Sequence, residues 1–465
     1  MRARIVRALG ALAVLFLVAD LAVPMAIDPA LRAFDFAPFY CAGEAVAEGA
    51  DPYRAMPLGA CEHRVAAGPF FASGVVMPAP LPPYALAALR LVALLPFDGA
   101  QRLLDWASVV SFALSAYLLR RLTRVPLGAI VFVIAPIAWV VLALGQTLLL
   151  MLCALTVCAA LLERGHDRWA ALVASVLMVE PHVGLPVCAS LFVWRARTRP
   201  ALLATAAAFA ALAVGVLSWP VVVEYVTVVL PLHGRSEVYA PAQLSLTAVL
   251  AGLGVPAGTA LRLAALQYAA AVIAGIGVAR ALELRLGVRG ALALVPPLFA
   301  VAGGTFIHAT DFLLAVPAAL LIAANTTCAA LSTAALVAIG AHWIAVGGLP
   351  GPLLTVVSSA AVVYARHRRL TAALTVGALA ALAVAAFALH PEGPRTVLGA
   401  VAPADFAEVS WERFVHVHAA TAIDFVVRLP LWAGVIALCA LALNLAIRRR
   451  EEASMRPALS LATGT

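Results

Sequence analysis

Charge is scarce in this sequence, and lysine is absent altogether. Only 12% of the 465 residues are charged, all 31 basic side chains are arginine, and 64% of the residues are hydrophobic. Soluble domains carry about twice this share of charged residues, so the composition excludes an ordinary soluble fold. The alternating segments of a membrane β-barrel are also missing, whereas apolar runs of about 20 residues recur. The sequence therefore predicts an all-α polytopic membrane protein, whose helices pair their own backbone groups.

Several functional elements are missing as well. The sequence has no Gly-rich phosphate loop, no soluble cytoplasmic domain and no recognisable internal repeat. A primary ATP-driven pump is therefore disfavoured, because nothing here would hold the nucleotide. The net charge of +8 comes from arginines in short links between apolar runs. That arrangement indicates membrane orientation and attraction to anionic lipids, and it gives no support to a nucleic-acid partner.

The arginine clusters set the expected topology. By the positive-inside rule these links and both chain termini, including the tail 448–465, belong in the cytoplasm. The whole chain, 1–465, is expected to form one integral membrane domain with about 12 to 14 transmembrane helices. The first apolar run is too long for a signal peptide, so we expect a retained helix. The candidate spans are 5–27, 103–119, 126–143, 146–163, 168–180, 184–194, 200–218, 259–281, 290–304, 311–324, 328–347, 352–365, 370–389 and 430–447.

Acidic and aromatic residues fall on the opposite, extracytoplasmic side. Three long polar stretches lie there, namely 28–102, 219–258 and 390–429. Cys41 and Cys61 both belong to the first stretch, where an oxidising compartment allows a disulfide. The sequence alone does not show whether their Cα atoms come within the required distance of about 7 Å.

The stretch DFAPFYCAGEAVAEGADPY, residues 35–53, predicts a short helix on the membrane surface. Its apolar side includes Tyr40, while Glu44 faces water. Asp35 directly precedes this helix, and an N-cap is the ordinary role for an Asp in that position. The proline-broken stretch 78–106 predicts a second juxtamembrane element. Together these elements are expected to cover a cavity in the membrane.

Two short apolar runs, 168–180 and 184–194, meet at Glu180-Pro181-His182. A helix of thirteen residues reaches only about 20 Å, which is too short to cross the bilayer. The turn is therefore expected within the membrane, where it lines a cavity. In the alternative interpretation the hairpin is tilted, and Glu180 lies at the outer interface.

His308 and Asp311 stand at the outer start of another span. Residues three apart share a helix face, so both side chains can point into one cavity. In the alternative interpretation Asp311 only stabilises the helix N-terminus, and His308 is solvated beside it.

The run from Asp35 to Tyr53 resembles the first-loop signature of glycosyltransferase family eighty-seven. These enzymes are the polyprenol-phosphate-mannose-dependent mannosyltransferases of the GT-C superfamily. The Asp, the aromatic pair, the Gly and the closing Gly-x-x-Pro-Tyr match that signature. The similarity continues through 145–186 and the region of His308, and it covers most of residues 1–320.

This resemblance implies a GT-C-like helical bundle and an inverting, mannosyltransferase-like hexosyltransferase of the bacterial cytoplasmic (inner) membrane. It implies transfer of a sugar, mannose in this family, from a polyprenyl-phosphate donor to a lipid or glycan acceptor on the extracytoplasmic face. Asp35 takes the position of the family's general base. His308 is the first candidate to bind the donor phosphate. The other substrate-binding candidates are Asp311, Tyr40, Glu44, Arg54, Gln146, Glu180 and His182.

One departure from the family pattern is Glu180, where related sequences often carry a basic residue. An acid here points to a changed donor, a changed acceptor or lost activity. We expect no cofactor and no obligatory metal, since a polyprenyl monophosphate can leave once side chains neutralise its charge. The carboxylates of Asp35, Glu44, Asp51, Glu180 and Asp311, with His308, would suit Mg²⁺ or Mn²⁺ only if they converge.

Two other functions are compatible with the residues. A lipid or sugar transporter, or a flippase, would use Glu180, His182 and Asp311 as proton or substrate sites. A non-catalytic scaffold for cell-envelope synthesis would explain Glu180 but leave the polar outer stretches without a role.

Overall fold

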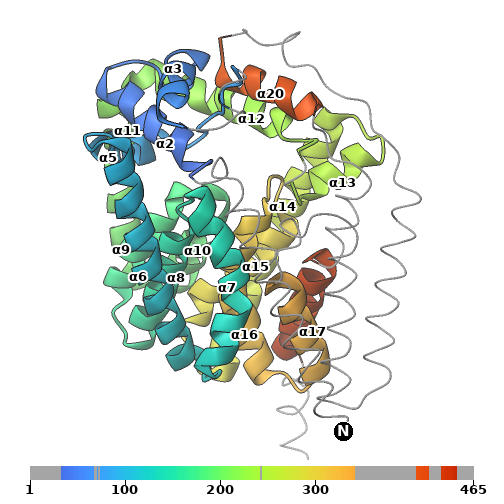
Figure 1. Ribbon diagram of the computed structural model, residues 1–465. Coiled ribbons are helices and arrows are strands. Elements are labelled where there is room, and N and C mark those ends of the chain that lie inside the picture. The colour runs from blue at the N-terminus through green and yellow to red at the C-terminus, as the bar shows by residue number, and fades with distance from the viewer. Residues whose placement is uncertain are drawn as a thin grey trace, which may run out of the picture.

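The computed structural model describes residues 33–66, 71, 74–240, 243–340, 405–417 and 431–447. The regular elements in these residues are helices, which form a bundle beneath a layer of shorter helices (Figure 1). Four helices are long and apolar enough to cross a membrane: Phe97–Thr123, Leu127–Leu144, Ala196–Ser236 and Ala257–Leu286. The prediction of a helical membrane protein is thus supported. The candidate spans 5–27, 352–365 and 370–389 and the tail 448–465 lie outside the described residues.

The bundle follows the predicted spans closely, because each helix begins or ends at a local signal. Helix α6 (Phe97–Thr123) follows Pro96, and helix α7 (Leu127–Leu144) follows Pro126. Proline presets the backbone angle needed at a helix start. Gly145 ends α7 in the left-handed conformation with φ +73, and a Cβ there would lie 2.6 Å from Phe36 Cβ. Helix α8 (Leu148–Glu163) follows directly, so Gln146 lies in a tight turn.

Short helices form a layer that we call the roof. Three come from the stretch 28–102, where juxtamembrane helices were predicted, namely α2 (Phe36–Ala47), α3 (Ala55–Val65) and α5 (Pro83–Val92), and two come from stretches predicted as loops, namely α12 (Leu230–Ser236) and α20 (Ala407–Val417). A disulfide joins Cys41 to Cys61, with their Cα atoms 5.6 Å apart. Segments distant in sequence meet here, because Ala55 N–H donates to the carbonyl oxygen of Asp405 at 2.6 Å. The roof has its own hydrophobic core, which includes Tyr53 and Phe406.

The stretch 219–258, expected as a polar loop, is largely helical. Helix α11 (Arg199–Glu224) bends at Ser218, whose φ is +68, and continues through η4 (Tyr225–Val229) into α12. A short helix, α13 (Leu246–Gly252), then leads to α14 (Ala257–Leu286). The bend allows a long apolar helix to run from the bundle into the roof.

Two pairs of short helices stop partway along the bundle. The first pair is α9 (Asp167–Val176), extended by η2 (Leu177–Val179), and α10 (Pro181–Trp194). The second is α15 (Ala291–Gly303) and η5 (Ala309–Ala315), which continues as α16 (Val316–Asn325). A helix of about 13 residues covers only about 20 Å. The turns of both pairs therefore lie inside the protein rather than at its surface.

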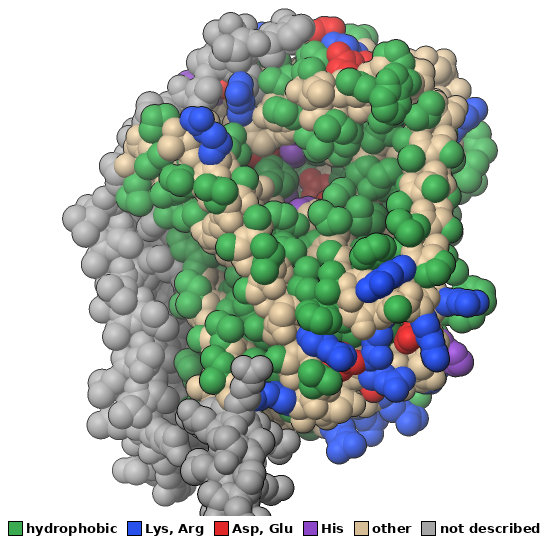
Figure 2. Space-filling view, turned by 180° about the vertical axis from the view of Figure 1, so that it is seen from behind, with side chains coloured by type: hydrophobic (Ala, Val, Ile, Leu, Met, Phe, Trp, Pro, Cys, Tyr) green, Lys and Arg blue, Asp and Glu red, His purple; other side chains and the backbone are tan. Residues whose placement is uncertain are grey.

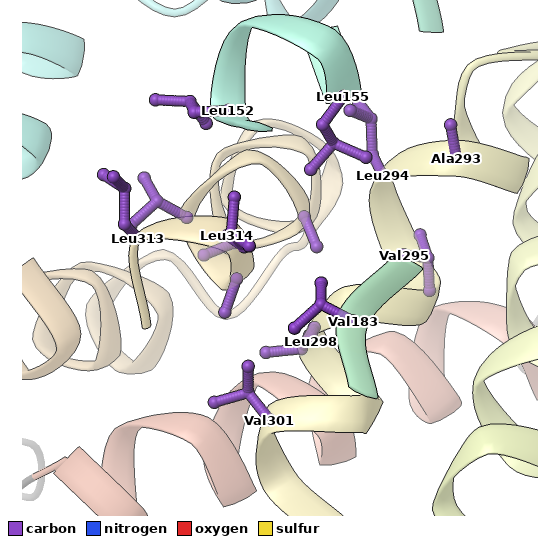
Figure 3. Close-up of a cluster of buried hydrophobic side chains, with 14 of the residues drawn as sticks. Leu152, Leu155, Val183, Ala293, Leu294, Val295, Leu298, Val301, Leu313 and Leu314 are labelled. Carbon is purple, nitrogen blue, oxygen red and sulfur yellow. The ribbon is translucent and has the colours of Figure 1, made fainter. Parts of the chain in front are cut away.

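A dry core holds these two turns in place (Figure 3). Leu152 and Leu155 of α8, Val183 of α10, Leu298 of α15 and Leu314 of η5 meet in it, and each is fully buried. In a membrane this core is held by van der Waals packing of closely fitting side chains, which resists displacement of the turns. Further helices, α17 (Ala329–Gly340) and residues 431–447, complete the described bundle.

Candidate functional site

Five connections meet beneath the roof and carry most of the predicted site residues. They are the start of α2, the α7–α8 turn, the α9–α10 turn, the end of α12 and the α15–η5 turn. Their polar side chains interact across these elements, as the following contacts show. We call this group the subroof site; its members are Asp35, Gln146, Glu180, His182, Glu237, His308 and Asp311.

Asp35 does not cap helix α2 with its side chain. It occupies the N-cap position in a helical backbone conformation, without a side-chain capping hydrogen bond. Its Oδ2 instead accepts a hydrogen bond of 2.6 Å from Gln146 Nε2. The backbone is fixed as well, because Asp35 N–H donates to the carbonyl oxygen of Leu144 at 2.9 Å. Burial raises the pKa of Asp35 to about 6, against the opposing effects of Gln146 and the charge of His308.

His308 faces a buried carboxylate that the sequence did not point to. Its Nε2 lies 3.6 Å from Glu237 Oε2, and Trp411 Nε1 donates to the other oxygen of Glu237. Burial alone would lower the pKa of His308, but the carboxylates of Glu237, Asp311 and Asp35 raise it to about 9. His308 is therefore a cation at neutral pH, and 31% of its side chain remains exposed.

Asp311 takes the second of the two roles considered from the sequence, because it stabilises the start of η5. Its Oδ2 accepts the backbone N–H of His308 at 2.8 Å, which caps η5. The same oxygen lies 3.5 Å from His182 Nε2, while His182 Nδ1 lies 3.7 Å from Glu180 Oε2. Tyr268 holds this turn by donating a 2.6 Å hydrogen bond to the carbonyl oxygen of His182. The two broken helix pairs are thus joined through an imidazole between two carboxylates.

A cavity of about 1490 Å³ opens beside this group, between α5, α10, α11, η4, α12 and α14. Its walls are mostly apolar, and Tyr84 and Phe209 stack at 4.6 Å on one side. Glu180, His182 and His233 lie on its polar wall. Figure 2 shows a hollow with a hydrophobic rim and with His and acidic side chains deep inside. This cavity can accommodate an apolar chain whose polar end reaches Glu180 and His182.

Asp35 and His308 lie next to this cavity rather than in its wall. The lining includes Phe306, whose ring stands edge-on to His308 at 4.7 Å between centroids. His308 in turn lies close enough to Asp35 for the charge of each to shift the pKa of the other. Both retain some exposed surface. Asp35, His308 and Asp311 are therefore outside the cavity lining, and Asp35 is connected to it through its electrostatic interaction with His308 and the contact of His308 with Phe306.

Three of the candidate residues lie in the roof, away from the cavity lining. Tyr40 is buried and donates to the carbonyl oxygen of Leu95 at 2.9 Å, whereas Glu44 pairs with Arg64. Arg54 forms ion pairs with three carboxylates, Asp51 at 2.9 Å, Glu224 at 2.6 Å and Asp405 at 3.0 Å. With three acids around it, Arg54 is better suited to tie roof elements together than to receive a phosphate.

Sequence reasoning missed four residues of this region. Glu237 and Trp411 support His308, and Arg235 and Arg262 line the cavity. Arg235 has no carboxylate partner among the described residues, and Arg262 contacts its own helix through Gly258 O at 3.1 Å. Arg235 belongs to the polar stretch 219–258 and Arg262 to the predicted span 259–281, and the sequence did not show that both side chains reach one cavity.

The described residues contain no group of three or more His, Cys, Asp or Glu side chains placed to hold a metal ion. Comparison with known proteins yields no family model, curated protein or solved structure that matches this chain. Inference about function therefore depends on the geometry of the subroof site and on the resemblance of the first-loop residues.

Proposed function

We propose that this protein is an inverting membrane glycosyltransferase. It moves a sugar, mannose by resemblance, from a polyprenyl-phosphate donor to a lipid or glycan acceptor on the extracytoplasmic face of the bacterial inner membrane. The proposal includes a GT-C-like bundle of about 12 to 14 transmembrane helices with cytoplasmic termini. The observation that carries it is the carboxylate of Asp35, held by a hydrogen bond from Gln146 and interacting electrostatically with His308, whose neighbour Phe306 lines a large apolar cavity.

The apolar cavity supports a lipid-linked donor. An isoprenoid chain would lie along its hydrophobic walls, with the phosphate near His182 and within the electrostatic field of His308. Arg235 and Arg262 at the same cavity favour entry of an anionic headgroup. A water-poor site makes such charge interactions stronger than they are in bulk water.

Asp35 supplies the base for the transfer step. Its carboxylate takes the proton of the acceptor hydroxyl as that oxygen bonds to the anomeric carbon. The bond from this carbon to the phosphate oxygen breaks, and the polyprenyl phosphate leaves with the electron pair. Attack opposite the leaving group inverts the anomeric centre. Asp35 then releases the proton to water, and Gln146 holds the carboxylate in place throughout.

The test is sugar transfer in membranes containing the full-length protein and a radiolabelled polyprenyl-phosphate mannose. We expect Asp35→Asn to lower transfer by about 10²- to 10⁴-fold, because the acceptor loses its base. Asp98→Asn is the matched control, since Asp98 is exposed and stands at the start of α6. Equal transfer by Asp35→Asn and wild-type protein at equal expression would overturn the assignment of the base.

A transporter or flippase is the second candidate, favoured by the meeting of two broken helix pairs at Glu180, His182 and Asp311. Discontinuous helices that meet around ionisable residues are typical of secondary transporters. Movement of a fluorescent lipid phosphate across reconstituted vesicles, lost in Asp311→Asn and retained in Asp35→Asn, would support this candidate. Sugar transfer lost in Asp35→Asn supports the enzyme.

A further inference from the structure

A second cavity, of about 1350 Å³, lies at the opposite end of the bundle between α6, α7, α8, α16 and α17. Helix α8 connects the two regions, because it begins at Leu148 below the roof and ends at Glu163 in the wall of this cavity. Its 16 residues span about 24 Å at 1.5 Å per residue. This cavity is therefore separate from the subroof site.

Uncompensated positive charge distinguishes this cavity, which we call the arginine pocket. Arg121, Arg124 and Arg164 line it, and none has a carboxylate partner within the described part of the chain. Glu163 is the single acid among the lining residues, and its Oε1 already accepts the backbone N–H of Gly290 at 2.7 Å. The pocket therefore has net positive charge and unused guanidinium donors.

Three other arginines near this end of the bundle, Arg195, Arg280 and Arg285, have their charge or donors satisfied within the protein. Arg195 and Arg280 share the buried carboxylate of Glu283. Arg285 donates to backbone carbonyl oxygens at the end of the helix 431–447. Figure 2 shows basic side chains gathered at this end of the molecule, although only some of them belong to the pocket. Arg121, Arg124 and Arg164 differ from these three in that they line one cavity together without a carboxylate partner among the described residues.

The remaining walls of the pocket are apolar. Leu118 and Leu122 of α6, Phe132 of α7, Leu320 of α16 and Leu336 of α17 contribute to the lining. A free anion needs the arginines but gains nothing from these walls. A ligand with an anionic headgroup and a hydrocarbon chain uses both surfaces, since guanidinium binds phosphate oxygens in a bidentate manner and the chain is removed from water.

We propose that the arginine pocket binds the headgroup of an anionic phospholipid, with part of an acyl chain against its apolar wall. Basic pockets between transmembrane helices on the cytoplasmic side recognise such headgroups. The site is independent of the proposed sugar transfer, because it shares no residue with the subroof site. It would fix this end of the bundle to one leaflet whatever reaction takes place beneath the roof.

The experiment is a native mass spectrometry titration of the full-length protein in neutral detergent. The probes are phosphatidylglycerol, phosphatidylcholine and inorganic phosphate. We expect phosphatidylglycerol to bind at least about tenfold more tightly than phosphatidylcholine, and Arg121→Gln/Arg124→Gln/Arg164→Gln to remove at least about tenfold of that affinity. Arg197→Gln is the control, since Arg197 is exposed at the same end and does not line the pocket.

A second variant tests the pocket without changing its charge. Gly128 lines it, and a Cβ added there meets no atom within 4 Å. The Cβ of Gly128→Phe therefore meets no clash, and we expect its ring to occupy part of the pocket and weaken phosphatidylglycerol binding while every arginine remains. Equal binding of the two lipids, or unchanged binding in both pocket variants, overturns the proposal. Displacement of phosphatidylglycerol by millimolar inorganic phosphate also overturns it, because the pocket would then be a free-anion site.

Discussion

Two groups of buried carboxylates in this protein differ in whether a cationic side chain contacts them. In the subroof site, Glu237 and Asp311 are each 4% exposed and each lies within 4 Å of a histidine. In the roof, Glu62 and Glu408 are each 1% exposed, and neither forms an ion pair with a described residue. Glu62 accepts one backbone N–H from Met77, and neither oxygen of Glu408 has a hydrogen-bond partner among the described residues.

The difference shows that burial and pairing with a cation have opposite effects on the pKa of these carboxyl groups. Burial raises the pKa of Glu62 and of Glu408 to about 8, so both are largely protonated at neutral pH. Burial acts in the same direction on Glu237, but His308, His233 and Trp411 bring the pKa of Glu237 below its ordinary value. Glu237 in the subroof site therefore keeps its charge, whereas Glu62 and Glu408 in the roof give theirs up. Retained charge in a low-dielectric region is the feature expected of a reactive site.

The largest effect is expected when the cation of the subroof site, His308, is removed, because this difference between the two groups of carboxylates then disappears. His308→Asn leaves Glu237 without its cationic partner, although the hydrogen bond from Trp411 remains. It also removes the positive charge that acts on Asp35. We expect sugar transfer to fall by about 10²- to 10³-fold, as for loss of one donor to developing negative charge. His63→Asn is the matched control, because His63 is an exposed roof residue. A loss shared equally by both variants would contradict a specific role for His308.

The pH profile of transfer separates the two subroof charges. Asp35 acts as a base only when it is deprotonated, so kcat/KM should fall as the pH drops below about 6. His308 loses its charge above a pKa of about 9, and the rate should fall again there. Glu237→Gln removes a carboxylate that raises the pKa of His308, so the alkaline limb should move to lower pH while the acid limb changes little. An unchanged alkaline limb in Glu237→Gln would contradict the pairing.

Features set by neighbouring residues could be predicted from the sequence, whereas contacts between residues far apart in the chain could not. Hydropathy and arginine clusters placed the described spans, and the short runs around Glu180 predicted a turn on a cavity, where the structure places Glu180 and His182. The contact of Asp35 with Gln146 joins residues 111 positions apart, and no spacing rule predicts it. Glu237 was missed for the same reason. The continuation of α11 into α12 was missed because 219–258 was taken as a polar extracytoplasmic loop, whereas the helix bends at Ser218 and continues.

A smaller effect is expected for Glu408 in the roof, because burial already keeps this carboxyl group largely protonated at neutral pH. Glu408 has a pKa near 8 in the folded protein and 4.5 in its ordinary state, so the folded state loses stability as the pH rises through this interval. Glu408→Gln removes the titration. Its thermal midpoint should therefore exceed that of the wild type by several degrees more at about pH 9 than at about pH 5. Glu48→Gln, at an exposed position, is the control. The same offset at both pH values would show that Glu408 is not protonated in the fold.

The smallest effect is expected for a carboxylate that is neither buried nor close to a histidine. Glu44 pairs with Arg64, and their side chains are 22% and 59% exposed. Water screens this pair, so Glu44→Gln should lower the free energy of unfolding by less than about 1 kcal/mol. The loss should shrink further when salt shortens the Debye length to a few ångströms, roughly 3 Å at 1 M. Thermal midpoints at low and high salt give the measurement, with Glu48→Gln again as the control. A large, salt-independent loss would mean that Glu44 belongs with the buried carboxylates, and the distinction between the roof surface and its interior would have to be redrawn.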